Sequence, residues 1–525
     1  MGRYINIGNA GFQRIRNGEY VDKSGLIAVV NRTLFTERCF SCVSRSRRFG
    51  KSMAAKMLYA YYDHSCDSRS LFADLEIARD PGFEKHLNRY AAIYLDMTDF
   101  VSRYKEDGIV GKIDAALLED VSKAYANVAV RPGDQLMDYL VDVVEATGEQ
   151  FVFIIDEWDA ICRELASGTK AMDAYVSWLR RMFKSQQAMR VFAGVYMTGI
   201  LPVKKYKTES ALNNFQEYSM VSPGRMDSYF GFTKDEVRML AERHGMDFDE
   251  LEKWYDGYQL GGLLSMFNPN SVMQAIDNNW CSSYWGRTGA VDAVGSYISM
   301  NYEGLKDDII QMLAGGRCKV NPIGFRNDIS EIFSRDDVLT VLIHLGYLSY
   351  DRRTMECYIP NLEVSYEMES AVKANNWAGV VTALQASEEL LQATLAADEE
   401  TVARCIDAAH DENTSILSYN DENSLSCVLS IAYYAARNNY HVHREYASGK
   451  GFADLVLIPR KNVDSPAIVI ELKFNQSADT AIDQIKRRQY SKKVTEYADN
   501  LLLVGISYDK QAKTHACHIE RMSSL

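Results

Sequence analysis

The sequence lacks any uninterrupted apolar run of the roughly 18 residues that a membrane-spanning helix needs. Its first residues, MGRYIN, contain no apolar secretory core. A surplus of positive charge is missing as well, because the net charge is -13. This balance argues against a protein that binds nucleic acid through its whole surface. We therefore expect a cytoplasmic protein with no membrane partner, in which any contact with an anion is local.

A disulfide or zinc framework is also missing, although the chain has ten cysteines. Cys39 and Cys42 are the only pair with C-x-x-C spacing, and no second pair follows that could complete a zinc site. Both lie in an apolar stretch, residues 38–43, that predicts a strand. Buried thiols are therefore favoured over metal ligands, and a reducing compartment fits.

The composition that is present is that of a soluble globular protein, with 47% apolar and 25% charged residues. A chain of 525 residues is too long for one ordinary hydrophobic core. We therefore expect about two to four domains.

A basic turn follows the predicted strand and precedes a predicted helix that begins near Met53. The turn ends Gly50-Lys51-Ser52, as phosphate-binding loops do. Backbone N–H groups at the helix start would point at phosphate oxygens. Lys51 would reach the β- and γ-phosphates, and the Ser52 hydroxyl would sit on Mg²⁺. The match to G-x-x-x-x-G-K-[ST] is incomplete, because Arg45 occupies the place of the first glycine.

Five apolar residues, 151–155, precede Asp156 and Glu157 and predict a buried parallel strand that ends at the carboxyl edge of a sheet. Ligands bind at that edge in open α/β sheets. Asp156 would hold Mg²⁺ directly or through water, and Glu157 would polarise the attacking water. The pair alone could instead cap a helix, but its occurrence together with Gly-Lys-Ser favours a nucleotide site. Thr198 ends another predicted strand, 191–198. It would either sense the γ-phosphate or orient water, or it would only bond to backbone.

Residues 45–52 resemble the R-P-R-R-F-G-K-[ST] loop of prokaryotic AAA-ATPase-like proteins that carry a C-terminal PD-(D/E)XK nuclease-like domain. Ser46 stands where that family usually has proline. The resemblance extends over nearly the whole chain, through the segments YVDKS (20–24), IIDEWD (154–159), MTGI (197–200), LNN (212–214), FGFT (230–233), WYDGY (254–258) and FNP (267–269). It implies ATP and Mg²⁺ as cofactors.

The predicted nucleotide-binding residues are Arg47, Arg48, Phe49, Gly50, Lys51, Ser52, Asp156 and Thr198, with Ser52 and Asp156 as metal ligands and Glu157 as the catalytic residue. Arg47 and Arg48 either form a solvated basic turn or stabilise charge on a phosphate. Asp22 or Ser24 is a candidate N-cap of a helix at 25–31, and the roles of Asp22 and Lys23 toward a nucleotide are unassigned.

Three regions follow from the patterns before residue 411. Alternating strands and helices over 1–226 predict a doubly wound parallel sheet. The helical, aromatic-rich pattern of 227–290 predicts a lid subdomain, whose aromatic side chains either pack inside it or form a stacking surface. Within 291–410, a helix that runs into a strand over 336–348 and a hairpin between 348–352 and 355–359 predict a winged-helix-like module that binds DNA or protein. An Ala/Glu/Leu-rich stretch, 364–407, predicts a helical spacer.

The last region, 411–525, holds a second set of charged residues. Period-two geometry puts Glu471 and Lys473 on one face of an otherwise apolar strand. Such a pair is costly unless it is ion-paired or bound to a metal. Asp454, on the preceding predicted strand, could share Mg²⁺ with Glu471, while Lys473 orients the attacking water or stabilises the pentavalent phosphate.

The order of elements in this region resembles the PD-(D/E)XK nuclease core: acidic helix, strand, Asp strand, E-x-K strand, helix, strand. Gln484 on the closing helix resembles the additional glutamine of exonuclease-like members, and residues 445–454 match E-x-x-x-G-x-G-x-x-D. The resemblance therefore predicts the catalytic residues Asp454, Glu471, Lys473, Gln484, Glu422 and Glu445, with Asp454 and Glu471 as metal ligands. A basic helix face either touches a phosphate backbone or is solvated; it comprises Lys486, Arg487, Arg488, Lys492 and Lys493.

Taken together, the sequence predicts an α/β protein: a P-loop NTPase sheet with a helical lid, a winged-helix-like middle module and a restriction-endonuclease-like C-terminal domain. We expect nucleotide-regulated, Mg²⁺-dependent cleavage, with DNA favoured over RNA as the partner. The alternative is a nucleotide-dependent switch or scaffold whose nuclease-like domain binds nucleic acid or a partner without cleaving. The chain could assemble as a homo-oligomer, and no arginine finger can be identified.

Overall fold

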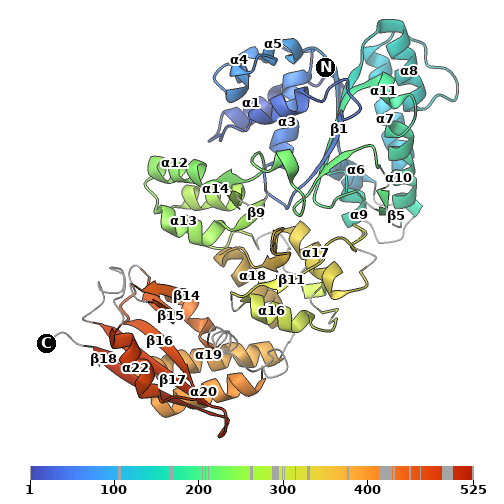
Figure 1. Ribbon diagram of the computed structural model, residues 1–525. Helices are drawn as coiled ribbons and strands as arrows, with labels where there is room; N and C mark the ends of the chain where they lie inside the picture. Colours follow the sequence, from blue (N-terminus) through green and yellow to red (C-terminus); the bar gives the residue numbers. More distant parts are fainter. Residues whose placement is uncertain are drawn as a thin grey trace. The chain divides into compact units, whose positions relative to one another are not determined.

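The computed structural model divides into two compact units (Figure 1). Unit 1 comprises Met1–Thr288 and Lys319–Val364, and unit 2 comprises Gly289–Cys318 and Ser365–Leu525. The structure describes residues 2–104, 108–164, 170–203, 205–206, 209–210, 212–260, 264–285, 295–297, 299–300, 302–313, 315–327, 332–374, 378–412, 429, 432–448, 451–460, 463–487 and 500–522. Within these ranges, no helix is both long enough and apolar enough to cross a membrane. The domain boundaries inferred from the sequence stay predictions.

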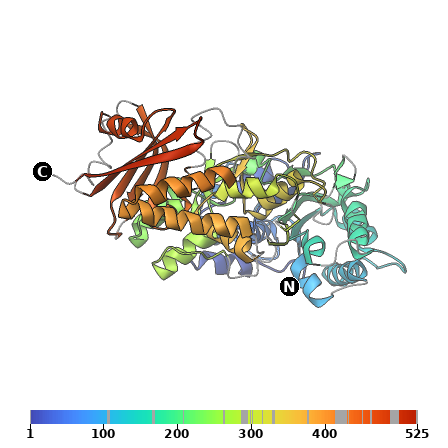
Figure 2. The ribbon, with the colours of Figure 1, turned by 90° about the horizontal axis from the view of Figure 1, so that it is seen from below.

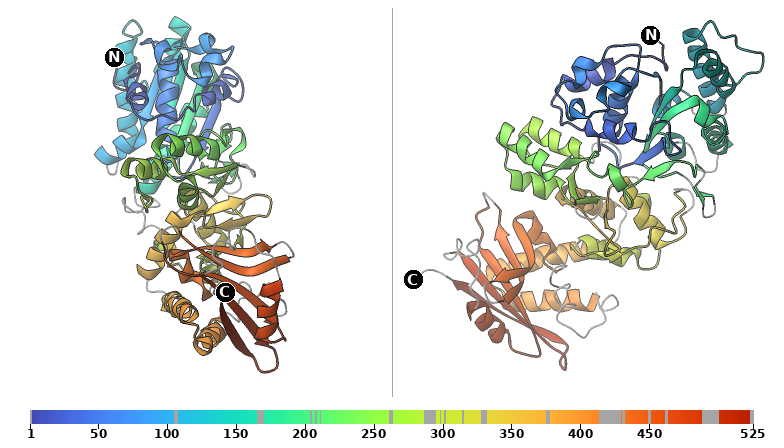
Figure 3. Two further views of the ribbon diagram at one scale, coloured as in Figure 1. Left: turned by 90° about the vertical axis from the view of Figure 1, so that its left-hand side faces the viewer. Right: turned by 45° about the horizontal axis from the view of Figure 1, so that its top comes forward.

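A five-stranded parallel sheet forms the centre of the first part of unit 1 (Figures 1 and 3). Its order is β2-β3-β4-β1-β7. The strands are β1 (Phe40–Ser44), β2 (Ala91–Asp96), β3 (Phe151–Asp156), β4 (Phe192–Gly199) and β7 (Gln216–Tyr218). The strand before the phosphate loop, β1, is thus separated from the acidic strand, β3, by β4. This order brings the carboxyl end of β4 between the two sequence motifs.

Helices cover both faces of this sheet, as the apolar pattern of its strands requires. On one face α3 (Lys51–Tyr62) packs against β2, β3 and β4, and α1 (Ala10–Arg16) packs on α3. On the other face, alternate residues of the strands share a core with the helices α6 (Met97–Arg103), α7 (Ile109–Ala124), α8 (Leu136–Thr147), α9 (Ala160–Glu164), α10 (Lys170–Phe183) and α11 (Ala188–Val191). The predicted doubly wound parallel sheet is therefore confirmed.

Short elements complete this part of the unit. They are α2 (Gly25–Asn31), α4 (Arg69–Phe72), η1 (Glu76–Arg79), α5 (Phe83–His86), β5 (Lys205–Tyr206), β6 (Glu209–Ser210) and η2 (Gly224–Met226). The helix predicted at 25–31 is confirmed at both ends. Cys39 and Cys42 are free and buried, as predicted, and burial raises the pKa of both thiols.

The predicted lid contains three helices and a small antiparallel sheet, β8-β10-β9. The elements are β8 (Phe232–Thr233), α12 (Lys234–His244), α13 (Phe248–Tyr255), β9 (Tyr258–Leu260), β10 (Leu264–Phe267) and α14 (Pro269–Asn278). Thr233 caps α12 in a capping box with Glu236. Most of the aromatic side chains are buried, which supports packing over stacking for Tyr255, Tyr258, Tyr284 and Trp285. Trp280, by contrast, is 70% exposed.

A helix and a hairpin follow in the last part of unit 1, as the sequence predicted. Helix α17 (Arg335–Leu345) precedes β12 (Ser349–Asp351) and β13 (Glu356–Tyr358), which pair antiparallel. Strand β11 (Cys318–Lys319) lies beside β13 in the order β11-β13-β12. A helix followed by a hairpin, with a third strand at its edge, agrees with the winged-helix-like module.

Unit 2 contains a mixed five-stranded sheet in the order β14-β15-β16-β17-β18. Strands β16 and β17 are parallel, and the other neighbours are antiparallel. The strands are β14 (Tyr440–Ser448), β15 (Gly451–Pro459), β16 (Ala467–Phe474), β17 (Leu501–Asp509) and β18 (Thr514–Met522). The helices are α16 (Leu305–Leu313), α18 (Leu362–Ala374, which begins in unit 1), α19 (Ala378–Ala396), α20 (Glu399–Glu412), η4 (Tyr434–Asn438) and α22 (Ala478–Arg487).

The two faces of this sheet carry different helices. Helices α19 and α20 lie side by side on one face (Figure 2) and share a core with it through Leu390, Leu391, Val402 and Ile406. Helix α22 packs on the other face. The sequence pattern predicted a helical spacer at 364–407, and the structure corrects this interpretation. Helices α19 and α20 complete the core of the C-terminal sheet, because their apolar residues are buried against it.

Candidate nucleotide and nuclease sites

A cavity of about 390 Å³ lies over the phosphate loop in unit 1. Its volume is within the roughly 300–1,000 Å³ of small-molecule sites. The start of α3 forms one wall, and the segments before α2, before α12 and at the start of α14 form the others. The lining residues are Glu19, Tyr20, Val21, Lys23, Arg48, Phe49, Gly50, Lys51, Ser52, Met53, Ala54, Met57, Glu157, Tyr229, Gly231, Phe232, Pro269, Asn270 and Met273. The lining therefore combines charged and apolar side chains, as a nucleotide site requires.

Lys51 lies at the first position of α3 and is buried. Its Nζ donates to the backbone oxygen of Ser46 at 3.0 Å and lies 3.6 Å from Oε1 of Glu157. Burial lowers the pKa of Lys51, while nearby carboxylates, Glu157 first, act in the opposite direction. Gly50 precedes the helix at φ 85°, a left-handed conformation that glycine adopts without steric cost. The loop thus holds its lysine on internal partners that a phosphate could replace.

Asp156 ends β3 and receives hydrogen bonds from three hydroxyl groups. The hydroxyl of Thr198 on β4 donates to Oδ1, that of Tyr94 on β2 donates to Oδ2 at 2.9 Å, and Ser52 also bonds to this carboxylate. Burial raises the pKa of Asp156, and the hydroxyl groups oppose that effect. A hydroxyl and a carboxylate in contact are oxygen ligands of the kind that Mg²⁺ prefers. Ser52 and Asp156 therefore fit the metal role predicted for them.

Tyr94 is a site residue that the sequence did not reveal. It lies in a strand that the sequence did predict, two residues before the end of β2. Its contact with Asp156 depends on β2 being the neighbour of β3, which the sequence did not specify. Thr198, which was predicted, contacts Asp156 and also accepts a hydrogen bond from the backbone N–H of Glu157 at 3.3 Å. Its contact with a phosphate stays a prediction.

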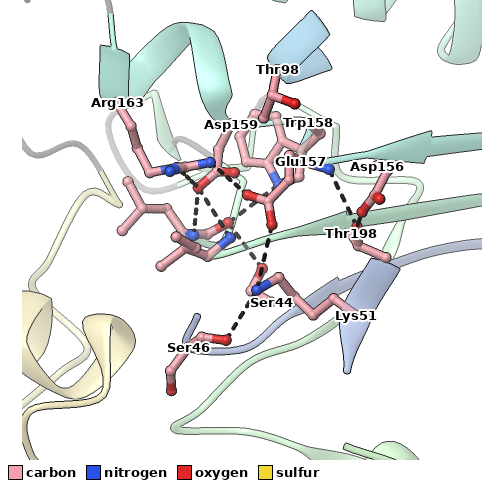
Figure 4. Close-up of polar contacts among 12 residues, drawn as sticks. Ser44, Ser46, Lys51, Thr98, Asp156, Glu157, Trp158, Asp159, Arg163 and Thr198 are labelled. Atoms are coloured by element: carbon pink, nitrogen blue, oxygen red, sulfur yellow. Dashed lines mark hydrogen bonds and ion pairs between the residues drawn. The ribbon is translucent and has the colours of Figure 1, made fainter. Parts of the chain in front are cut away.

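Glu157 follows Asp156 in a turn that is tied to β4 (Figure 4). Its φ is 53°, a conformation that costs a non-glycine residue roughly 1–3 kcal/mol. Hydrogen bonds from the backbone N–H groups of Glu157 and Trp158 to Thr198 hold this turn. The turn aims Glu157 at the cavity, where its side chain is 19% exposed.

Two charged neighbours of Glu157 were also missed by the sequence, although they form an i,i+4 pair. Asp159 is fully buried, and its Oδ2 accepts the backbone N–H groups of Ile200 and Leu201. Arg163 on α9 donates to Asp159 and to Glu157 (Figure 4). The acidic turn is thus a four-charge cluster that includes Lys51.

The other loop residues mainly anchor the loop to the protein. Arg45 is fully buried and donates to the backbone oxygens of Ser44, Tyr218 and Met226. Burial lowers its pKa to about 10. Arg45, which stands at the first glycine position of the P-loop pattern, therefore has a structural role, because its guanidinium donates hydrogen bonds to three backbone carbonyl groups. Substitution would leave those groups unpaired.

Arg48 and Phe49 extend this anchoring toward the lid. Nη1 of Arg48 donates to the backbone oxygen of Tyr284 at 2.6 Å, and the ring of Phe49 meets Tyr258 edge-on at 5.0 Å. Arg48 also lines the cavity, whereas Arg47 is exposed. Of the two arginines, only Arg47 therefore fits the interpretation as part of a solvated basic turn.

The segment before α2 also has defined contacts. Ser24 occupies the N-cap position of α2, but its side chain makes no capping hydrogen bond. Asp22, the other candidate, instead accepts the backbone N–H groups of Ser24 at 2.8 Å and Glu76 at 2.7 Å just before the helix. Nζ of Lys23 donates to both carboxylate oxygens of Glu236 at 2.7 Å. Lys23 therefore ties the cavity wall to the start of α12.

The candidate nuclease residues lie on one face of the sheet of unit 2. The β15–β16 ladder ends with Leu455 opposite Ile470, and Asp454 and Glu471 are the next residues of the two strands. Residues opposite each other in an antiparallel ladder share a face, and Lys473 follows two residues later on the same face. Oδ2 of Asp454 accepts the backbone N–H of Leu472 at 2.7 Å.

Glu471 is the most enclosed member of this set. It is 2% exposed, and its Oε1 lies 3.4 Å from Nζ of Lys473. Gln484, on α22, also donates to Oε1 of Glu471. Gly505 makes this contact possible, because a Cβ there would lie 2.3 Å from the backbone oxygen of Ala478 and push α22 away. The predicted E-x-K pair and glutamine therefore do converge.

Two carboxylates on adjacent strands with a lysine fit a divalent cation held by oxygen ligands. A cluster of three or more acidic, histidine or cysteine ligands is not found in the part of the chain that the structure describes. Glu445 lies on β14, and Glu422 lies outside the described residues. On the basic face, Lys486 pairs with Glu520 and Arg487 is exposed, while the other three predicted members also lie outside.

Comparison with protein families agrees with both sites. Residues 6–208 match the family model described as predicted AAA-ATPase, and residues 420–517 match the PD-(D/E)XK nuclease superfamily. The chain joins an AAA-ATPase-like domain to a PD-(D/E)XK nuclease-superfamily domain. The resemblance inferred from the sequence motifs is thereby confirmed.

Similar proteins extend this picture without adding a function. An uncharacterised protein from the vnfD 5′ region of Azotobacter chroococcum mcd 1 is 22% identical over 545 residues, with 97% of each chain covered. A Walker-type ATPase of Pyrococcus abyssi is 11% identical and covers 66% of this chain and 94% of its own, with a TM-score of 0.32. The ORC2 protein of Aeropyrum pernix in its ADPNP–ADP complexes is 12% identical and covers 69% and 98%, with a TM-score of 0.31. TM-scores this low support no assignment. The AAA-ATPase-like domain and the nuclease-superfamily domain are assigned from the family matches and from the geometry of the two sites.

Proposed function

We propose that this protein hydrolyses ATP at the phosphate loop, and that hydrolysis licenses Mg²⁺-dependent cleavage of DNA by the C-terminal sheet. The observation that carries the first part is that Lys51, Ser52 and Glu157 line one cavity, and that Ser52 bonds to Asp156. The protein would act in the cytoplasm on a nucleotide and a nucleic acid, with DNA favoured over RNA, and could act as a homo-oligomer.

Each residue of the nucleotide site has a defined task. Lys51 would leave Ser46 and Glu157 to bind the β- and γ-phosphates, and backbone N–H groups at the start of α3 would bind phosphate oxygens. Ser52 and Asp156 would hold Mg²⁺, which neutralises the phosphate charge when bound. Glu157 would accept the proton of the attacking water.

The nuclease-like site would use a similar division of labour. Asp454 and Glu471 would hold a divalent cation, which supplies Lewis-acid chemistry when bound. Lys473 would orient the attacking water or stabilise charge on the phosphate, and Gln484 would fix the orientation of Glu471. The buried Glu471–Lys473 pair supports this role, because a charged pair on an apolar strand is costly without a function or a ligand.

The alternative is a nucleotide-dependent switch or scaffold that binds nucleic acid or a partner without cleaving. One observation favours it: Asp454 and Glu471 already bond to protein groups, namely the backbone N–H of Leu472 and the side chains of Lys473 and Gln484. It predicts that ATP changes the oligomeric state or partner binding.

The test is cleavage of single- and double-stranded DNA and RNA in Mg²⁺ or Mn²⁺, with and without ATP. Asp454→Asn should abolish cleavage and leave ATP hydrolysis unchanged, whereas Lys51→Ala should abolish the stimulation by ATP. If Lys51→Ala cleaved DNA at the wild-type rate in the presence of ATP, the proposed regulation of cleavage by ATP hydrolysis would be wrong. If no condition gave cleavage while ATP was still hydrolysed, the nucleotide-dependent switch or scaffold would be the function that is supported.

A further inference from the structure

Arg163 joins two carboxylates of the acidic turn with one guanidinium (Figure 4). Its Nε lies 3.1 Å from Oδ2 of Asp159, and its Nη2 lies 2.5 Å from Oε2 of Glu157. The side chain is 9% exposed. Although burial alone would lower it, the carboxylates of Asp159 and Glu157 raise the pKa of Arg163. The guanidinium therefore stays charged and bridges the two residues.

The two carboxylates that Arg163 bridges have different surroundings. Asp159 is fixed, because Oδ2 also accepts the backbone N–H groups of Ile200 at 3.1 Å and Leu201 at 2.8 Å, just after β4. Glu157 instead lines the cavity. Arg163 thus ties the side chain of Glu157 to Asp159, which two backbone N–H groups hold in place.

Glu157 has a different cation on each of its oxygens. Oε2 meets Arg163, and Oε1 lies 3.6 Å from Nζ of Lys51. Lys51 would turn to a bound γ-phosphate, which carries more negative charge than a single carboxylate. Oε1 would then lose its cation, while Oε2 would keep Arg163.

We propose that Arg163 is a positioning residue for ATP hydrolysis, which holds one oxygen of Glu157 so that the other faces the attacking water. This rests on the proposed function of the site. In the step, the water oxygen forms a bond to the γ-phosphorus and the bond from that phosphorus to the bridging β–γ oxygen breaks. The proton of the water goes to Oε1 of Glu157, and Arg163 exchanges no proton.

The planar fork of arginine suits this task and lysine does not. A guanidinium offers separate N–H groups to two carboxylates, whereas an ammonium on a flexible stem cannot hold both in one geometry. Arg163→Lys keeps a positive charge beside the buried Asp159 but releases Glu157. It is a safer variant than Arg163→Ala, which leaves a buried carboxylate without a cation and endangers the fold.

The experiment measures steady-state ATP hydrolysis by the full chain, for the wild type, Arg163→Lys, Glu157→Gln and the double variant. We expect Arg163→Lys to lower kcat about tenfold to a hundredfold, because the proton acceptor is misplaced. KM and the Kd of a fluorescent ATP analogue should stay within about twofold, since Arg163 does not line the cavity. The double variant should be no slower than Glu157→Gln, because Arg163 acts through Glu157.

Arg103→Lys is the matched control. Arg103 also pairs with an aspartate four residues earlier, Asp99 on α6, but is 33% exposed and does not contact Glu157. Its kcat should equal that of the wild type.

Three outcomes would overturn the inference. Arg163→Lys could hydrolyse ATP at the wild-type kcat, or it could raise KM and Kd as much as it lowers kcat. The double variant could be slower than Glu157→Gln by the full factor of Arg163→Lys, which would mean that Arg163 acts independently. A wild-type protein that binds but does not hydrolyse ATP would be distinguishable, because it would remove the proposed function together with this inference.

Discussion

The two candidate sites both place carboxylates at buried strands, but they gather them in different ways. In the nucleotide site, side chains come from β2, β3, β4, α3 and α9, which are spread from Lys51 to Thr198 along the chain. In the nuclease-like site they come from β15, β16 and α22, which follow one another. A site built from consecutive elements is visible in residue spacing, whereas one built across a sheet depends on strand order.

The largest expected effects separate the two sites. Lys51→Ala should lower kcat for ATP hydrolysis by roughly 10²–10³, because it removes a charge that stabilises the transferring phosphate. Asp454→Asn should lower the cleavage rate by a comparable factor and leave ATP hydrolysis unchanged. Lys51→Ala should abolish the stimulation of cleavage by ATP but leave the cleavage measured without ATP unchanged. Initial rates of phosphate release and of DNA cleavage on the same preparations provide the measurement.

Two results would contradict this separation if circular dichroism showed an intact fold: loss of ATP hydrolysis in Asp454→Asn, or loss of the ATP-independent cleavage in Lys51→Ala. One site would then depend on the other for its assembly. Lys123→Ala, on the exposed face of α7, is the control for loss of a lysine, since its ion pair with Glu119 is exposed and should contribute little.

The second prediction concerns the packing on which the nuclease-like site depends. Gly505→Val should destabilise unit 2 by about 1–3 kcal/mol, because the new side chain collides with the backbone at Ala478 and with Ile482. Cleavage should fall as Gln484 moves from Glu471. Differential scanning calorimetry, read together with ATP hydrolysis, should show one transition lowered and the ATPase unchanged.

Gly111→Ala on α7 is the contrasting control, because nothing lies within 4 Å of its added Cβ and its φ is ordinary. It should be neutral or stabilising by up to about 1 kcal/mol. Equal losses of stability in both variants would contradict the packing explanation.

The sequence predicted those helices and strands that are determined by residues close together in the chain. It located the strand of Asp156 and Glu157 and the helix at 25–31, because apolar runs and turn residues lie side by side in the chain. The family resemblance singled out Gln484, and the structure adds its contact with Glu471, because the helix that follows a strand packs against it. It did not predict the strand order, which arises from contacts between residues that are distant in the chain.

The residues that the sequence missed have the same physical explanation. Tyr94 reaches Asp156 only because β2 is the neighbour of β3. Arg163 reaches Glu157 only because the turn after β3 adopts a left-handed conformation, which the sequence pattern does not announce. The spacer interpretation failed for a related reason, because an Ala/Glu/Leu-rich helix shows its burial only when its partner sheet is known.

The third prediction tests the cross-strand contact directly. Tyr94→Phe should lower kcat for ATP hydrolysis about fivefold, since one hydrogen bond of roughly 1 kcal/mol to the Asp156 carboxylate is lost. A hydrogen bond to a carboxylate stabilises its charged form and lowers its pKa. Its removal should therefore raise the pKa of Asp156, and the acid limb of the pH profile of kcat should move to higher pH.

Tyr125→Phe is the control, because its hydroxyl bonds to exposed Glu149 and lies outside the cavity. Its pH profile should match that of the wild type. If Tyr94→Phe shifted the acid limb to lower pH, the hydrogen bond would not be stabilising charged Asp156.

The smallest expected effects distinguish the two arginines beside the phosphate loop. Arg48→Ala should weaken the binding of ATP by about three- to tenfold, because it removes the hydrogen bond to Tyr284 that anchors the loop. Arg47→Ala should change affinity by no more than about twofold, since its side chain is exposed and surface charges are screened by salt. Titration of a fluorescent ATP analogue at low and physiological salt measures both. A larger loss for Arg47→Ala that persists at physiological salt would mean that Arg47 binds phosphate directly, and this site would then draw one more ligand from residues that are consecutive in the chain.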